Sequence, residues 1–238
     1  MLWKNPWQPE AVMMLIGGIA LSFFSGNLAV ELLHQSSVVG FKTLNDAGSV
    51  LIATLCFHGM AIVLGIPFLK LHNIDLADAL GWHEPKVKQN LLLAVGLLAV
   101  VAPMMLALKF LSGELLHRIG WPLEDQRAVE IFAGTKSPWI RAYLAFFAVA
   151  IAPVAEEFVF RGLMFSGLKK LGWHKGAWIV TSLMFAAIHN SAAILLPLFV
   201  FALALTWLYQ KTEGLLAPIV AHGLFNAVNL ALLIAAGK

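Results

Sequence analysis

Long apolar runs repeat along the whole chain, and short polar segments separate one run from the next. A helix of about 20 apolar residues spans the roughly 30 Å hydrocarbon core of a bilayer, so each run predicts a membrane-spanning helix. The fourth run is long and the fifth is short, so the pattern predicts an all-α, polytopic transmembrane helix bundle of seven or eight spans. The predicted spans lie near residues 11–33, 49–69, 90–112, 139–168, 173–189, 192–209 and 215–236.

The composition excludes a soluble globular domain of this length. Of the 238 residues, 60% are hydrophobic and only 12% are charged, too few to coat a soluble surface. The longest polar connection runs only from about residue 114 to 138, which predicts a single membrane-embedded domain over residues 1–238 with the lipid bilayer as its partner. The formal net charge is only +3 and the basic residues lie mostly in loops, so we expect no nucleic-acid partner.

The stretch AEEFVFRG, residues 155–162, places two carboxylates and an arginine inside the fourth apolar run. Ionisable groups at membrane depth are costly, and those that occur usually face a protein interior where they do chemistry or transport. Residues four apart share a helix face and residues five apart diverge by about 140 degrees, so Glu157 can pair with Arg161 while Glu156 points elsewhere. Pro153 lacks an N–H and predicts a kink beside this site.

Two further elements carry polar residues at helical spacing. FAAIH ends at His189, and HGLFN places His222 and Asn226 on one helix face at i and i+4. Three spans therefore supply a glutamate, two histidines and an asparagine, and two chemistries remain open. The set could hold a divalent metal through two histidines and a glutamate, or activate water with Glu156 and a histidine while the other polar groups stabilise an oxyanion.

The remaining histidines show no partner in the sequence pattern, so we expect structural or solvated roles for them. His58 stands apart because it lies inside the second predicted span. The single cysteine, Cys56, permits no intramolecular disulfide and no cysteine metal cluster. The histidines in this group are His34, His58, His72, His83, His117 and His174.

The ordered segments EEFVFR, FAAIH and HGLFN resemble the CPBP family of intramembrane proteases, also called the Abi or CAAX-protease family, whose motifs are EExxxR, FxxxH and HxxxN. The resemblance covers about residues 150–228, within a motif-bearing half of about 139–236. The first three spans carry no motif. The resemblance implies an intramembrane endopeptidase that hydrolyses peptide bonds of membrane-associated or lipidated substrates.

The resemblance also implies a role for each motif residue. Glu156 corresponds to the water-activating base, and His189 helps to orient or activate that water. His222 and Asn226 correspond to the pair that stabilises the oxyanion. The supporting charges are Glu157 and Arg161.

The sequence leaves open whether the site binds a metal ion. The family is often called a metalloprotease, which would make Glu156, His189 and His222 the ligands of one zinc or other divalent ion, yet the same residues have also been read as a metal-free glutamate site. We prefer the metal-free chemistry, because Asn226 is better explained as an oxyanion donor than as a fourth zinc ligand.

Two other functions compete with proteolysis. Intramembrane glutamates and histidines could form the proton relay of a coupled transporter. Alternatively, an immunity or scaffold membrane protein could keep the fold without turnover, although none of the expected catalytic positions is replaced here. We expect an integral membrane protein, in the plasma (inner) membrane if the source is prokaryotic, and a peptide or lipidated protein as the substrate.

Overall fold

The computed structural model describes residues 8–35, 46–82, 86–122 and 126–237, and every regular element in these ranges is helical. Elements labelled η are π-helical. The elements are α1 (Pro9–Gln35), α2 (Asp46–Thr54), η2 (Leu55–Gly59), α3 (Met60–Leu71), α4 (Leu76–Leu80), α5 (Val87–Arg118), α6 (Arg127–Gly134), α7 (Pro138–Phe146), η3 (Phe147–Ile151), α8 (Ala152–Glu157), η4 (Phe158–Phe165), α9 (Ser166–Lys170), α10 (His174–Ala187), α11 (Ala192–Thr212) and α12 (Leu216–Ala235).

The expected helical membrane bundle is confirmed, with a slightly smaller number of spans. Within the described residues, 6 helical stretches are long and apolar enough to cross a membrane, against the seven or eight expected. The difference lies at α10, which has 14 residues and is therefore only about 21 Å long, short of the roughly 30 Å hydrocarbon core. Two of the spans are continuous rods built from several elements: α2, η2 and α3 form one, and α7 to α9 form the other.

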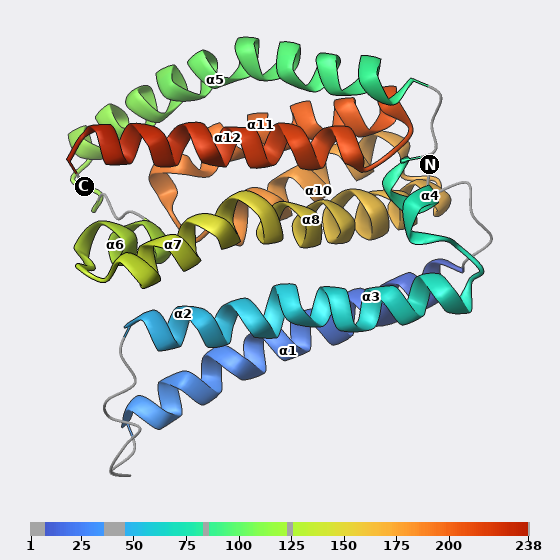
Figure 1. The fold of residues 1–238 in the computed structure, drawn as a ribbon, viewed down its shortest axis with the longest axis horizontal. Coiled ribbons are helices and arrows are strands. Elements are labelled where there is room, and N and C mark those ends of the chain that lie inside the picture. The colour runs from blue at the N-terminus through green and yellow to red at the C-terminus, as the bar shows by residue number, and fades with distance from the viewer. Residues whose placement is uncertain (1–7, 36–45, 83–85, 123–125, 238) are drawn as a thin grey trace.

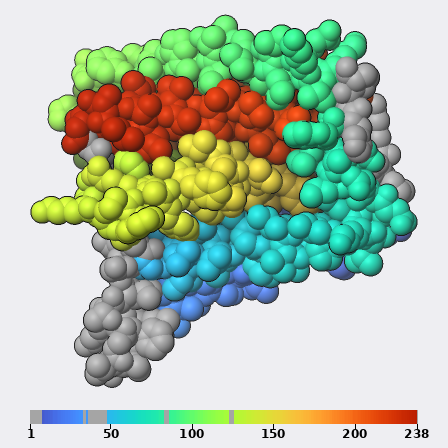
Figure 2. Space-filling model, in the orientation of Figure 1, coloured from blue at the N-terminus to red at the C-terminus, as the bar shows by residue number. Residues whose placement is uncertain are grey.

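The rod from α7 to α9 lies in the middle of the bundle (Figure 1). On one side of it α12 and α5 lie in successive layers, and on the other side lie α1 and the rod formed by α2, η2 and α3. In Figure 2 the rod that contains α2 and α3 packs directly against α7 and α8 without a break in the surface. The two carboxylates of the central rod can therefore be reached by side chains from both sides.

One cluster of buried apolar side chains joins helices from both halves of the chain. It includes Ile19 from α1, Ala61 from α3, Leu163 from η4 and Leu205 from α11, each at most 1% exposed. Many other large apolar side chains face outward, among them Phe110 on α5, which is 72% exposed. An outer surface of this kind suits contact with lipid and is typical of an integral membrane protein.

The π-helical segments change which backbone carbonyls are available beside the central carboxylates. In η3 the N–H of Ala152 donates to the carbonyl of Phe147, five residues earlier. The next residue is Pro153, which has no N–H, so the carbonyl of Ala148 receives no backbone donor in this register. The predicted effect of Pro153 on the local helix therefore takes a specific form, a carbonyl left open for a side chain.

Candidate active site

Glu157 and Arg161 form the ion pair that their spacing predicts. The Nη1 of Arg161 donates to Oε1 of Glu157 over 2.8 Å, and the two residues are 1% or less exposed. Nη2 of the same guanidinium donates to the carbonyl of Ala202 on α11 over 2.9 Å. The guanidinium also lies over the ring of Phe185, 4.7 Å from its centroid. A charge buried this deeply is tolerated because a carboxylate, a carbonyl and a ring face compensate it together.

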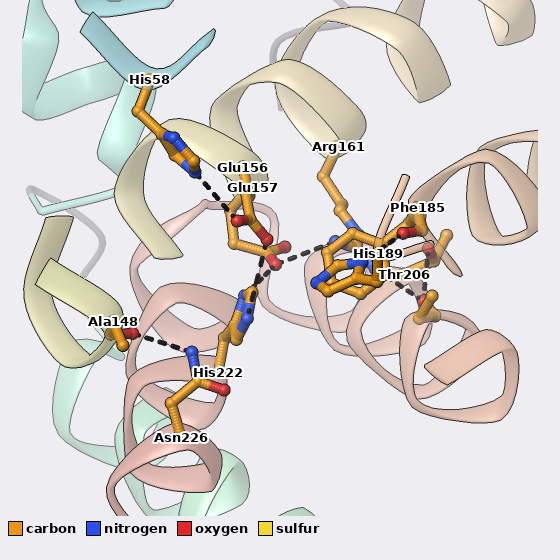
Figure 3. Close-up of polar contacts among 11 residues, drawn as sticks. His58, Ala148, Glu156, Glu157, Arg161, Phe185, His189, Thr206, His222 and Asn226 are labelled. Carbon is orange, nitrogen blue, oxygen red and sulfur yellow. Dashed lines mark hydrogen bonds and ion pairs between the residues drawn. The ribbon is translucent and has the colours of Figure 1, made fainter. Parts of the chain in front are cut away.

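The imidazole of His222 faces both glutamates (Figure 3). Its Nδ1 is 2.9 Å from Oε1 of Glu157, the same oxygen that accepts from Arg161. Its Nε2 is 3.8 Å from Oε2 of Glu156. The rings of Phe185 and Phe201 lie at centroid distances of 5.6 and 5.7 Å from the imidazole and limit its rotation. The imidazole is thus fixed by Glu157 at one nitrogen and presents the other nitrogen toward Glu156.

Glu156 is also held on its other side, by a residue that the sequence pattern did not select. Nε2 of His58, in η2, lies 3.0 Å from Oε1 of Glu156. Oε2 of Glu156 has no hydrogen-bond partner among the described residues. Of the two carboxylate oxygens of Glu156, Oε1 is therefore occupied by His58, and Oε2 is the one left to interact with water, as expected for a base. The signal that could have found His58 was its position inside an apolar run, the same criterion that selected the glutamates.

His189 lies just past the end of α10 and is half-buried. Its Nδ1 is 2.7 Å from the carbonyl of Phe185, a distance that places a proton on Nδ1 and leaves a lone pair on Nε2. The imidazole is near enough to interact electrostatically with Glu156 and His222. The first residue of the FAAIH motif therefore contributes to the site in two ways. Phe185 supplies the carbonyl that orients His189 and the ring beneath the guanidinium of Arg161.

Asn226 lies one turn after His222 on α12, as predicted, and its side chain points toward η3 (Figure 3). Its Nδ2 donates to the carbonyl of Ala148 over 2.8 Å, the carbonyl that Pro153 leaves open. The carboxamide is therefore fixed in orientation, and Nδ2 carries a second hydrogen beyond the one used in this bond.

The expected metal ligands do not form a three-ligand site as they stand. No group of three His, Cys, Asp or Glu side chains in the described part of the chain is arranged to hold a metal ion. Zinc binds histidine nitrogens at about 2.0–2.1 Å, so its ligands must point at one shared point. Nδ1 of His222 and Nδ1 of His189 make hydrogen bonds within the protein, so only the Nε2 atoms of these two histidines could be ligands.

Comparison with known proteins supports the resemblance that the motifs suggested. Residues 138–228 match the family model described as type II CAAX prenyl endopeptidase Rce1-like, a segment that contains all three motifs. Over 81 residues the chain is 30% identical to the UPF0177 protein YxdF of Lactococcus lactis subsp. lactis (strain IL1403). That similarity covers 34% of this chain and 42% of the relative, so the chain spans less than half the length of this curated relative. No solved structure matches.

Proposed function

We propose that this chain, whose residues 138–228 match the family model described as type II CAAX prenyl endopeptidase Rce1-like, is an intramembrane endopeptidase that uses glutamate-activated water. The observation that carries the proposal is the burial and hydrogen bonding of the Glu156 carboxylate. Its carboxylate is buried, one oxygen is held by His58, and the other oxygen lies without a hydrogen-bond partner in the described structure, beside Nε2 of His222. A buried carboxylate with one oxygen open is suited to act as a general base.

In the first step Oε2 of Glu156 takes a proton from water while the water oxygen bonds to the carbonyl carbon of the scissile peptide. The electron pair of the C=O bond moves to the oxygen and forms an oxyanion. Nε2 of His189 accepts a hydrogen bond from the second O–H of the water and so orients the attack, which agrees with the hydrogen bond that places the proton of His189 on Nδ1.

The oxyanion needs donors in a fixed position. Nε2 of His222 can donate to it while Nδ1 donates to Glu157, in which case the imidazole carries both protons and is stabilised by the buried carboxylate. The second hydrogen on Nδ2 of Asn226 is the other candidate donor. Because Phe201 and the carbonyl of Ala148 fix these two groups, little reorganisation is needed when the negative charge develops.

In the second step the C–N bond breaks, and protonated Glu156 returns its proton to the departing amine. The products are a carboxylic acid and an amine, and Glu156 is again a carboxylate. Arg161 and Glu157 do not exchange protons in this scheme. Their ion pair neutralises charge beneath the site and holds His222.

The metal-free scheme remains our preference for this chain. One observation supports it: Nδ2 of Asn226 is a hydrogen-bond donor rather than a metal-ligand atom. No step above is routed through a metal ion.

We expect the substrate to be a membrane-associated peptide or a lipidated protein, because Glu156, His222 and Asn226 lie on helices long and apolar enough to span a membrane. The location would be the plasma (inner) membrane of a prokaryotic source. A proton-coupled carrier is less well supported, because a relay does not require a carboxamide anchored to the carbonyl of Ala148. An idle immunity or scaffold protein is also less well supported, because every motif residue is present and oriented.

The test compares membranes from one host that expresses either the unmodified chain or Glu156→Gln. Peptide termini in the membrane fraction are identified by mass spectrometry. We expect a set of new termini that disappears with Glu156→Gln, because the amide cannot accept the proton from water. Glu114→Gln is the matched control, since Glu114 forms an exposed ion pair with Arg118 on α5. Identical termini for the unmodified chain and Glu156→Gln would overturn the proposed function.

A further inference from the structure

We infer that His58 is a positioning residue for Glu156, and that it determines which carboxylate oxygen accepts the proton from water. This inference rests on the proposed function, and it concerns a residue outside the segment that matches the family model. His58 comes from η2, 98 residues before Glu156 along the chain. It lies on the other side of the carboxylate from His222 (Figure 3).

The imidazole of His58 has a fixed orientation. The ring is 15% exposed and stands at nearly a right angle to two phenylalanine rings, Phe57 and Phe147, each with its centroid 4.9 Å away. Edge-to-face packing of this kind restricts rotation of the ring. Phe147 belongs to η3, so the rod that carries Glu156 also packs against the imidazole of His58.

The hydrogen-bond pattern gives the position of the proton. Nδ1 of His58 is buried without a partner among the described residues, whereas Nε2 faces a carboxylate oxygen at 3.0 Å. A buried N–H without an acceptor is costly, so in the neutral imidazole the proton belongs on Nε2, where Oε1 of Glu156 accepts it. Oε1 is thereby occupied by a donor, and Oε2 is left as the base.

The backbone supports this placement. His58 lies in a five-residue π-helical turn, closed by the N–H of Met60 on the carbonyl of Leu55. A π-helical turn inserts an extra residue into a helix and is common at functional sites. Here it lies within the rod of α2 and α3, beside α8. The helices before the motifs therefore do more than complete the membrane topology, because they supply a group that contacts Glu156.

The first arm of the test is independent of turnover. The carboxylate stretching band of Glu156 is identified by infrared difference spectroscopy as the band lost in Glu156→Gln, in purified protein reconstituted in lipid vesicles. We expect this band to shift in His58→Leu, which removes the donor. It should stay near its original frequency in His58→Gln, because the Nε2 of a glutamine can donate from the same place.

The second arm measures kcat and KM on a synthetic peptide that spans a cleavage site found by the proteomic comparison. We expect His58→Leu to lower kcat about 10- to 100-fold with little change in KM, because misplacing a reacting group costs rate rather than binding. We expect His58→Gln to restore most of the rate. His72→Gln is the control, because His72 contacts the carbonyl of Phe68 in its own helix and lies outside the site.

Each outcome decides the inference. An unshifted band and an unchanged kcat in folded His58→Leu would overturn it. A shifted band in His58→Leu together with loss of activity in both His58 variants would also overturn it, because it would show that the imidazole carries protons. A shifted band that glutamine restores, in a chain that cleaves no peptide, would support the positioning of Glu156 while contradicting the protease.

Discussion

The carbonyl oxygen of Val149 lies 2.6 Å from the point that a Cβ atom on Gly223 would occupy. Gly223 immediately follows His222 on α12, and Val149 belongs to η3, so this glycine permits the close approach of the two helices beside the site. The obstacle is a backbone atom, which cannot rotate away as a side chain can.

Gly223→Ala should therefore separate α12 from η3 and destabilise the protein by about 1–3 kcal/mol, the usual cost of overpacking. Proteolytic activity should fall with it, because His222 and Asn226 would move relative to Glu156. Thermal unfolding in detergent measures the first effect. Gly113→Ala on α5 is the matched control: beyond the adjoining residues and backbone of its own helix, its added Cβ would meet open space, and alanine favours the helix. Equal melting temperatures for the two variants would contradict the close approach.

Pro153→Ala should impair activity without unfolding the protein. The new N–H at position 153 can donate to the carbonyl of Ala148 and so compete with Nδ2 of Asn226 for the same acceptor. The helix gains a hydrogen bond, so the melting temperature should stay equal or rise while kcat falls. Pro103→Ala, which removes a proline from α5, is the control. Full activity in folded Pro153→Ala would show that the Ala148 contact does not matter.

The effects of Arg161 and Glu157 on the stability of the protein should be coupled. Arg161→Met leaves a buried carboxylate without its strongest partner and should cost about 3–5 kcal/mol of stability. The double variant Arg161→Met with Glu157→Gln removes both charges and should recover much of that loss. Glu156→Gln alone should leave stability nearly unchanged. Chemical or thermal unfolding of the four proteins measures these differences, and a double variant no more stable than Arg161→Met alone would disprove the coupling.

Metal dependence gives a separate prediction. In the metal-free scheme, treatment with a membrane-permeant chelator should leave peptide cleavage unchanged, and elemental analysis of active protein should find no stoichiometric metal. His189→Ala should reduce the rate because the water loses its orientation. If zinc is found at about one ion per chain and is lost together with activity in His189→Ala, the metalloprotease interpretation replaces ours.

Helical spacing predicted those parts of the fold and site that depend on one helix. The apolar runs predicted the membrane bundle, and the i, i+4 rule predicted the Glu157–Arg161 pair and the shared face of His222 and Asn226. Helical spacing does not predict contacts between segments that are distant along the chain. The His58 contact joins residues 98 positions apart, and nothing in the local pattern of either residue specifies it.

The hydrogen-bond partner of Asn226 could not be predicted from the sequence for a different reason. Its acceptor is a backbone carbonyl, made available by a π-helical register followed by a proline. Pro153 was visible in the sequence as a predicted kink, but a sequence does not show whether the preceding turn is α or π. The end of α10 at Ala187, just before the turn that contains His189, was likewise not specified by the apolar pattern.

The continuous rod from Pro138 to Lys170 sets a depth for the reaction. At about 1.5 Å per residue, Glu156 lies about 27 Å along the rod from its first residue and about 21 Å from its last, and so near the middle of the rod. Water and the scissile bond must both reach this level. A peptide in a regular membrane helix has its carbonyls already hydrogen-bonded, so a substrate has to unwind locally before attack. Cleavage sites should therefore fall within or beside apolar segments that contain helix-breaking residues.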